Sequence, residues 1–193
     1  MKNIFKFVIP MTLCLMACSK DSDSTPKKSY LVIGETSSKT TIVDQLIQSS
    51  TAVFDVNKDG VNDFEFEQYA NNNKNVNIQY FTQVKGLYPE AKIITNDTLS
   101  PIIFNENDSL NFSFNTTTTP SEMHKYSFIH TVIGGDGLEH IKGHWADTQE
   151  KFIGFVIEDG TKPILGWFKV SLGTGNTSSN LTIHSLGYQK SVY

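Results

Sequence analysis

Residues 55–63 carry oxygen-bearing side chains at a spacing that suits a hard cation. The candidate ligand set comprises the side chains at positions 1, 3, 5 and 9 of this segment and the backbone carbonyl at position 7: Asp55, Asn57, Asp59, Asp63 and Val61. Gly60, at position 6, permits the sharp turn that lets these oxygens converge. Calcium prefers oxygen ligands in a flexible loop, so the segment predicts a calcium ion that stabilises the loop and takes no part in catalysis.

The same segment also suits a turn without any ion, because Asn-Lys-Asp-Gly is a favourable hairpin sequence. On both sides of the loop, apolar residues alternate with polar ones and predict flanking strands: Phe54, Val56, Phe64 and Phe66. Phe66 stands at position 12, where an EF-hand has its bidentate glutamate. A β-hairpin is therefore expected around the loop, and not a helix-loop-helix unit.

In this hairpin setting the string Asp-x-Asn-x-Asp-Gly-x-x-Asp resembles the short calcium loops of thrombospondin-type and integrin-propeller repeats. Those families repeat the loop, whereas this chain carries a single copy. The resemblance implies a structural calcium ion held by residues 55–63.

The N-terminal segment has the pattern of an export signal. Lys2 and Lys6 accompany an apolar run over residues 4–17 that is too short to span a bilayer as a helix. The string Leu15-Met16-Ala17-Cys18 resembles the lipobox of bacterial lipoproteins, which implies cleavage before Cys18 and attachment of acyl chains such as palmitate to it. Several acyl chains would anchor the protein stably in a membrane. The alternative is ordinary secretion with cleavage elsewhere.

The residues after Cys18 predict where the exported protein is delivered. Residues 19–23, Ser-Lys-Asp-Ser-Asp, resemble the signal that directs some Gram-negative lipoproteins to the outer membrane, facing the cell exterior. A plain solvated tether would have a similar composition. The predicted organisation is a signal peptide over 1–17, a flexible tether over 18–29 and one domain over 30–193.

The composition of the chain argues against some classes of function. The chain has a formal charge of −4, no arginine and two cysteines, Cys14 and Cys18. One cysteine leaves with the signal peptide and the other would carry lipid, so no disulfide is expected. An acidic chain without guanidinium groups is a poor partner for nucleic acid. The expected partners are the membrane, through the lipid anchor, and a glycan or protein ligand.

The remainder of the chain predicts an all-β fold. Aromatic and β-branched residues alternate with polar ones between turn residues in four clear segments: 53–56, 64–67, 76–80 and 110–114. Residues 42–47 are the one short helix candidate. Thirteen Phe and seven Tyr supply the apolar bulk of a two-layer core. The predicted architecture is a jelly-roll-like antiparallel β-sandwich.

Residues 152–157 and 164–172 predict a hairpin with Asp159-Gly160 in its connection. Together with the aspartate loop, this region resembles a loose group of secreted bacterial β-sandwich proteins of unknown function, over residues 51–69 and 152–188. The resemblance implies fold and export, and it assigns no catalytic residues.

Trp145 and Trp167 are candidates for stacking against a sugar ring. In the second strand of the hairpin, Trp167 and Phe168 fall on opposite faces, and one of these faces is expected to look outward. An outward Trp167 would serve as a binding platform, and the alternative is burial.

Short patterns add weaker candidates. Asp-Ser/Thr-apolar strings resemble bacterial O-glycosylation acceptors and point to Thr98 and Ser109. His140 and His144 share one face of a strand, where a zinc ion would need a third ligand; exposed strand histidines are the alternative.

The remaining candidates concern hydrolysis. Glu65 and Glu67 also share a strand face, as the two catalytic carboxylic acids of a glycosidase could. The alternative is that they lie on the solvent-exposed face of a sheet, as most such pairs do. No serine-hydrolase elbow, phosphate loop or dinucleotide fingerprint occurs.

The expected function is a lipid-anchored binding or adhesion module with a structural calcium loop. One alternative is a structural envelope protein without a small ligand, which predicts that both tryptophans are buried. The other is a small glycan hydrolase, which predicts a concave site with two carboxylates, or a histidine within hydrogen-bond reach of a nucleophile.

Overall fold

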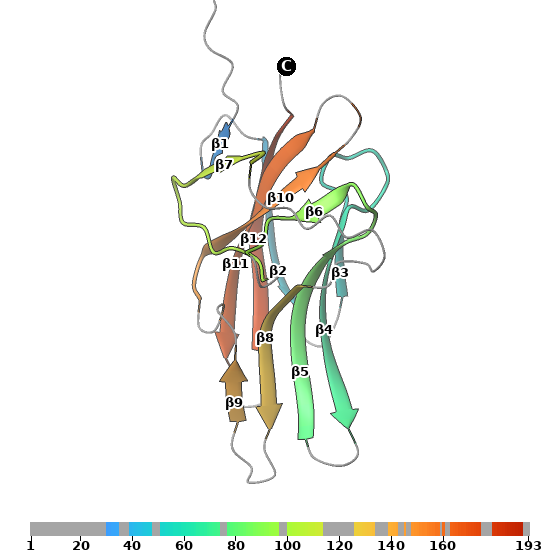
Figure 1. Ribbon diagram of the computed structural model, residues 1–193, viewed down its shortest axis with the longest axis vertical. Coiled ribbons are helices and arrows are strands. Elements are labelled where there is room, and N and C mark those ends of the chain that lie inside the picture. The colour runs from blue at the N-terminus through green and yellow to red at the C-terminus, as the bar shows by residue number, and fades with distance from the viewer. Residues whose placement is uncertain are drawn as a thin grey trace, which may run out of the picture.

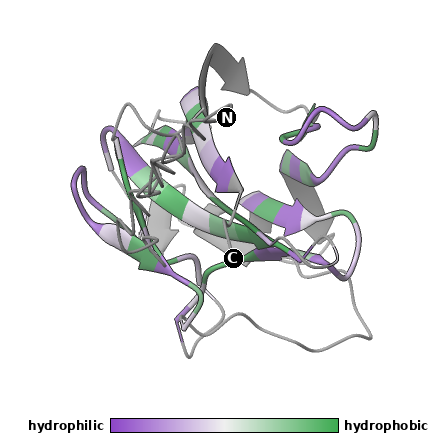
Figure 2. Cartoon of the chain, turned by 90° about the horizontal axis from the view of Figure 1, so that it is seen from above, coloured by the Kyte–Doolittle hydropathy of each residue, from purple (hydrophilic) through white to green (hydrophobic). Residues whose placement is uncertain are grey.

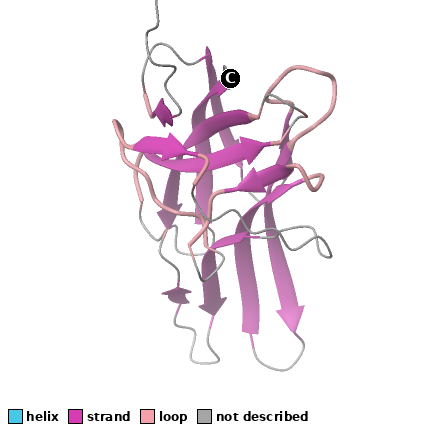
Figure 3. Ribbon diagram, turned by 45° about the horizontal axis from the view of Figure 1, so that its top comes forward, coloured by secondary structure: helices cyan, strands magenta, loops and turns pink. Residues whose placement is uncertain are grey.

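The structure is a computed structural model that describes residues 30–34, 39–47, 51–73, 77–96, 100–113, 126–133, 139–142, 145, 148–158, 160, 163–174 and 179–190. These residues form strands and loops, with no helix among them (Figure 3). Accordingly, the described part of the chain contains no helical segment that could cross a membrane. The predicted all-β class is confirmed.

The described residues form two five-stranded antiparallel sheets and a two-stranded pair (Figure 1). Sheet I has the order β2-β12-β11-β10-β6, with bounds Lys39–Ile47, Ser179–Lys190, Ile164–Thr174, Lys151–Ile157 and Ala91–Ile93. Sheet II has the order β3-β4-β5-β8-β9, with bounds Thr51–Phe54, Phe64–Asn73, Asn77–Gly86, Tyr126–Ile133 and Glu139–Lys142. The short pair joins β1 (Tyr30–Val32) to β7 (Ser109–Asn111).

Aromatic side chains from both sheets meet in the main core. The ring centroids of Phe64 and Phe155 lie 4.9 Å apart, and those of Phe66 and Phe168 lie 5.0 Å apart in an edge-to-face arrangement. Such aromatic pairs add to the stabilisation from burial alone. Because the two sheets bury their facing sides against each other, the predicted antiparallel β-sandwich is confirmed.

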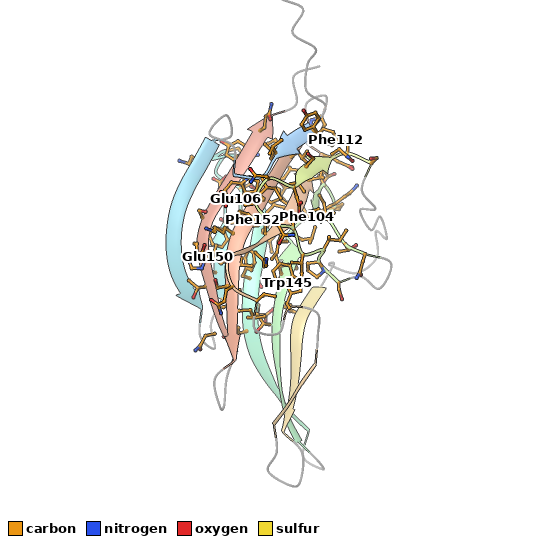
Figure 4. The ribbon with its side chains drawn as sticks, turned by 90° about the vertical axis from the view of Figure 1, so that its left-hand side faces the viewer. Phe104, Glu106, Phe112, Trp145, Glu150 and Phe152 are labelled. Carbon is orange, nitrogen blue, oxygen red and sulfur yellow. The ribbon has the colours of Figure 1, made fainter. Side chains whose placement is uncertain are left out.

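A second apolar cluster covers the other face of sheet I. Its buried members come from β1, β7, β10, β11, the residue after β1 and the segment between β6 and β7: Leu31, Ile33, Ile94, Phe104, Leu110, Phe152, Val156, Leu165 and Trp167. Phe104 and Phe152 exchange two backbone hydrogen bonds of 3.0 Å and lie close together in Figure 4. Both faces of β10 and β11 are therefore buried.

The hairpin predicted around Asp159-Gly160 is confirmed. Strands β10 and β11 pair from Lys151↔Val170 to Ile157↔Ile164. The opposite facings of Phe168 and Trp167 are also confirmed, since Phe168 lies in the main core and Trp167 in the second cluster. The expectation that one of these faces looks outward is wrong, because β1, β7 and the segment before β7 cover it.

Strand β12 contains one residue more than β11 at a bulge. Ser185 pairs with Lys169, and Ile183 pairs with the next residue of β11, which leaves His184 between them. In a regular strand Ile183 and Leu186, which are three positions apart, would face opposite sides of the sheet. The bulge lets both face the main core.

Two local predictions are corrected. Residues 42–47, the helix candidate, belong to strand β2, which pairs with β12 from Leu181↔Ile47 to Tyr188↔Lys39. Pairing with a strand from the far end of the chain overrides the weak local preference. The strand expected over 110–114 ends at Asn111, because the Asn111 side chain accepts a 2.9 Å hydrogen bond from the Ser113 N–H and forms a turn.

Candidate functional site

The acidic loop 55–63 closes a β-hairpin. Strands β3 and β4 pair antiparallel, and Phe54↔Phe64 is the last pair before the loop. Both phenylalanines are buried in the main core, which fixes the two ends of the loop. The hairpin expected from the sequence is confirmed.

The exposed half of the loop is organised by its own side chains. The two carboxylate oxygens of Asp55 accept hydrogen bonds from the N–H groups of Asp59 (3.1 Å) and Gly60 (2.8 Å). Asn57 Oδ1 accepts from the same Asp59 N–H over 3.0 Å, and Asn57 Nδ2 donates to Asp59 Oδ2 over 2.8 Å. Lys58 and Gly60 have φ values of 61° and 92°, the left-handed geometry that the turn requires. Oxygen atoms of Asp55, Asn57 and Asp59 are thereby brought together.

Asp63 has a different role in the buried half of the loop. Its side chain is 0 % exposed and accepts hydrogen bonds from the Val56 N–H (2.7 Å) and the Tyr88 hydroxyl. Burial raises the pKa of the Asp63 carboxyl above its ordinary value, although these hydrogen bonds act in the opposite direction. Asp63 therefore connects the loop to the chain that follows β5.

An open pocket of about 540 Å³ lies beside the exposed half of the loop. Residues from this loop, the β5–β6 connection and the β10–β11 connection line it: Asn57, Asp59, Val61, Tyr88, Glu90, Glu158 and Gly160. Three of them carry carboxylates, and the Lys92 amine lies 2.6 Å from Glu158. The pocket therefore offers acceptor oxygens and the Tyr88 side chain to a ligand. The connections that line it lie toward the end of the sandwich shown uppermost in Figure 1.

The donor set of the exposed half has the chemistry that calcium prefers, with two carboxylates and an amide oxygen. Among the described residues, no group of three or more histidine, cysteine, aspartate or glutamate side chains is placed to hold one metal ion. Asp63 contributes to this result, since its oxygens point to Val56 and Tyr88. Calcium binding stays a prediction for this loop.

Both candidate stacking residues are buried. Trp145 is 0 % exposed in the main core, and its indole N–H donates to the Pro101 carbonyl over 2.9 Å. Trp167 is 3 % exposed in the second cluster, and its indole N–H has no hydrogen-bond partner. The expected outward sugar platform at these two residues is therefore wrong, because each ring is enclosed by apolar side chains.

The glutamate pair on β4 is held by a lysine. Lys85 Nζ contacts Glu65 and lies 3.5 Å from Glu67, and Gln83 donates a 2.8 Å hydrogen bond to Glu67. Burial opposes the charge of Lys85, but hydrogen bonds and charge from both glutamates raise its pKa. A glycosidase pair needs two carboxyl groups that can act on the substrate, whereas Lys85 engages both of these.

Two of the remaining candidate residues lie on strands, and the others lie outside the described residues. Ser109 is exposed on β7, where it pairs with Val32. His140 lies on β9 and pairs with Val132. Cys18, Thr98 and His144, with the signal peptide and tether, lie outside the described residues.

One set of hydrogen-bonded polar residues was not predicted from the sequence. Ser171 Oγ lies 2.8 Å from His184 Nε2 and accepts a 2.9 Å hydrogen bond from the Glu150 N–H. These residues come from β11, β12 and the segment before β10, and only the strand register brings them together. No local motif marks them.

Comparison of the chain with models of protein families, with curated proteins and with solved structures found no match. Loop 55–63 with its pocket and the Ser171–His184 pair are two places where polar groups converge.

Proposed function

We propose that this protein is a lipid-anchored binding module of a bacterial outer membrane, with a calcium-stabilised loop beside its ligand pocket. The observation that carries the binding function is the pocket lined by residues of three separate connections next to loop 55–63. The export pattern ending at Cys18 supports the anchor and the envelope location.

Calcium would bind at the exposed half of the loop, through Asp55, Asn57, Asp59 and the Val61 carbonyl. Asp63 would complete the set by turning one oxygen outward, or remain the buried support of the loop. The ion would neutralise carboxylates that otherwise repel one another and would hold this wall of the pocket in place.

The ligand would be a glycan or a protein segment. Carboxylates accept hydrogen bonds from sugar hydroxyls and from amines, and Val61, 55 % exposed, adds an apolar contact at the rim. Both kinds of ligand could be recognised by the same acceptor groups, so the pocket defines the chemistry and not the source.

Thermal unfolding of the purified protein in excess calcium and in chelator tests the ion site. Calcium at a hundred times its dissociation constant should add about 2.7 kcal/mol, a rise in Tm of several degrees. Asp55→Ala and Asp59→Ala should remove this rise. Glu90→Ala removes one charge from the same pocket outside the loop and should retain it. Equal Tm values with and without calcium would reject the ion.

Binding to arrays of glycans and peptides tests the pocket. The protein should give saturable binding that Val61→Asp and Glu158→Gln weaken at least tenfold. Val53→Asp, which changes another exposed valine, on β3, should leave the binding unchanged. For the anchor, incorporation of a labelled palmitate analogue should disappear in Cys18→Ala. Absence of label in the unsubstituted protein would contradict lipidation.

A structural envelope protein without a small ligand is the second candidate. The observation that favours it is the burial of both tryptophans, which removes the aromatic platform expected of a sugar-binding surface. The array experiment separates the two functions, because this candidate predicts no saturable binding at all.

A further inference from the structure

Ser171 and His184 form a hydrogen-bonded pair on the face of sheet I opposite the main core. The Ser171 hydroxyl oxygen lies 2.8 Å from His184 Nε2. Val170 and Leu172 point into the main core, so Ser171, between them on β11, points the other way. His184 is the extra residue of the β12 bulge, and bulges commonly redirect a side chain near functional sites.

The Ser171 hydroxyl has two hydrogen-bonding neighbours, the Glu150 N–H and the His184 ring. The Glu150 N–H donates to the hydroxyl oxygen over 2.9 Å, so this oxygen acts as an acceptor on that side. With His184 in the tautomer protonated at Nδ1, the hydroxyl donates its single proton to His184 Nε2. In this arrangement the imidazole is the base, and the Glu150 N–H holds the Ser171 oxygen in position through one of its two lone pairs.

Glu150 supplies two further features. Its φ of 50° lies in the left-handed region that residues other than glycine rarely adopt, and such geometry clusters at functional sites. Its carboxylate lies 2.8 Å from Lys169 Nζ, and Lys169, with a smaller contribution from His184, lowers the pKa of Glu150. Figure 4 shows Glu150 beside the strands of sheet I.

Exposure to solvent increases from Ser171 through His184 to Glu150. Ser171 is 8 % exposed, His184 is half-buried and Glu150 is exposed. A substrate would reach the Ser171 oxygen past the exposed side chain of Glu150.

We propose that Ser171 is a nucleophile for acyl transfer from ester substrates, with His184 as its general base. The Ser171 oxygen would attack the ester carbonyl carbon while its proton passes to His184 Nε2. The bond from the carbonyl carbon to the leaving oxygen would then break, and His184 would return the proton to that oxygen. The products are an acylated Ser171 and an alcohol, so the atoms and electrons balance without a further reactant.

Labelling with a fluorophosphonate probe, followed by peptide mass spectrometry, tests the nucleophile. One probe molecule should attach per chain, at Ser171, and Ser171→Ala should lose the label. His184→Gln should slow labelling at least about 100-fold, the usual size of general-base catalysis. Ser109→Ala, which removes an exposed serine on β7, should be labelled at the unsubstituted rate.

A second measurement keeps folding separate from chemistry. His184 is half-buried, so His184→Gln is expected to keep the Tm of the unsubstituted protein within a few degrees. p-Nitrophenyl acetate should then acetylate Ser171 in the unsubstituted protein and not in this variant. Folded protein that carries no label at Ser171, or equal labelling in His184→Gln, would overturn the proposal.

Discussion

Loop 55–63 and the strand pair β10–β11 are stabilised by contacts of very different range along the chain. Hydrogen bonds in the exposed half of the loop join residues two to five positions apart. The strand pair is covered on one face by sheet II and on the other by β1, β7 and the segment before β7. Local chemistry therefore shapes the loop, whereas burial of the strands depends on segments that are remote in sequence.

Asp63 belongs to the loop but makes contacts with residues that are remote in sequence. It belongs to the loop in sequence, but its side chain accepts from Tyr88, 25 positions away. Its backbone joins Phe54 and Leu87 through hydrogen bonds of 2.7 and 2.9 Å. The comparison predicts that substitutions cost more stability as the lost contacts extend further through the fold, and the following experiments test this order.

The largest effect is expected in the main core. Phe168 is 0 % exposed and contacts aromatic rings from both sheets. Phe168→Ala should lower the free energy of unfolding by about 3–5 kcal/mol, because it creates a cavity between the sheets. Urea denaturation measures this loss, and Val53→Ala on the exposed side of β3 should change it by less than about 0.5 kcal/mol. A loss below 1 kcal/mol for Phe168→Ala would show that contacts between the two sheets do not contribute most to stability.

Asp63→Ala should rank second, with a loss of about 2–4 kcal/mol. The substitution leaves the Val56 N–H and the Tyr88 hydroxyl without their acceptor in or near the core. Asp55→Ala, in the exposed half, should lose about 1 kcal/mol in chelator, since water can replace its hydrogen bonds. Equal losses in urea denaturation would show that the two halves of the loop do not differ as described.

The pH dependence of stability should report the burial of Asp63. Burial raises its folded-state pKa above the ordinary value of 3.8, so the folded protein binds this proton more tightly than the unfolded chain. Stability contributed by this group therefore increases as the pH falls from neutral toward 3.8, by at most about 1.4 kcal/mol per unit. Asp63→Asn removes the titrating group. Urea denaturation from pH 7 to 4 should give the unsubstituted protein the more favourable slope on acidification, and parallel curves would refute the raised pKa.

The smallest expected difference separates the two tryptophans. Trp145→Phe and Trp167→Phe delete a similar volume from buried sites, but only Trp145 donates a hydrogen bond, to Pro101. Trp145→Phe should therefore be less stable than Trp167→Phe by about 1 kcal/mol. Thermal unfolding of both variants measures the difference, and a reversed order would mean that the shape of the cavity outweighs the hydrogen bond.

The features that the sequence predicted correctly depend on short-range patterns. Alternation and turn residues located the hairpins around residues 55–63 and 158–163, and they separated the facings of Phe168 and Trp167. The same reasoning placed a helix at residues 42–47, because nothing nearby shows that this segment pairs with β12. It also expected an outward face at Trp167, since a single strand does not reveal what covers it.

The all-β class, the hairpin turn over 55–63 and the pairing of β10 with β11 follow from local sequence, because side-chain period and turn chemistry act over a few residues. The tertiary structure adds three features: a second layer buries Trp167, Asp63 turns toward Tyr88, and a bulge brings His184 to Ser171. These features depend on the register and stacking of strands far apart in the chain. The free energy that selects them comes from burial of the whole core, which no local segment contains.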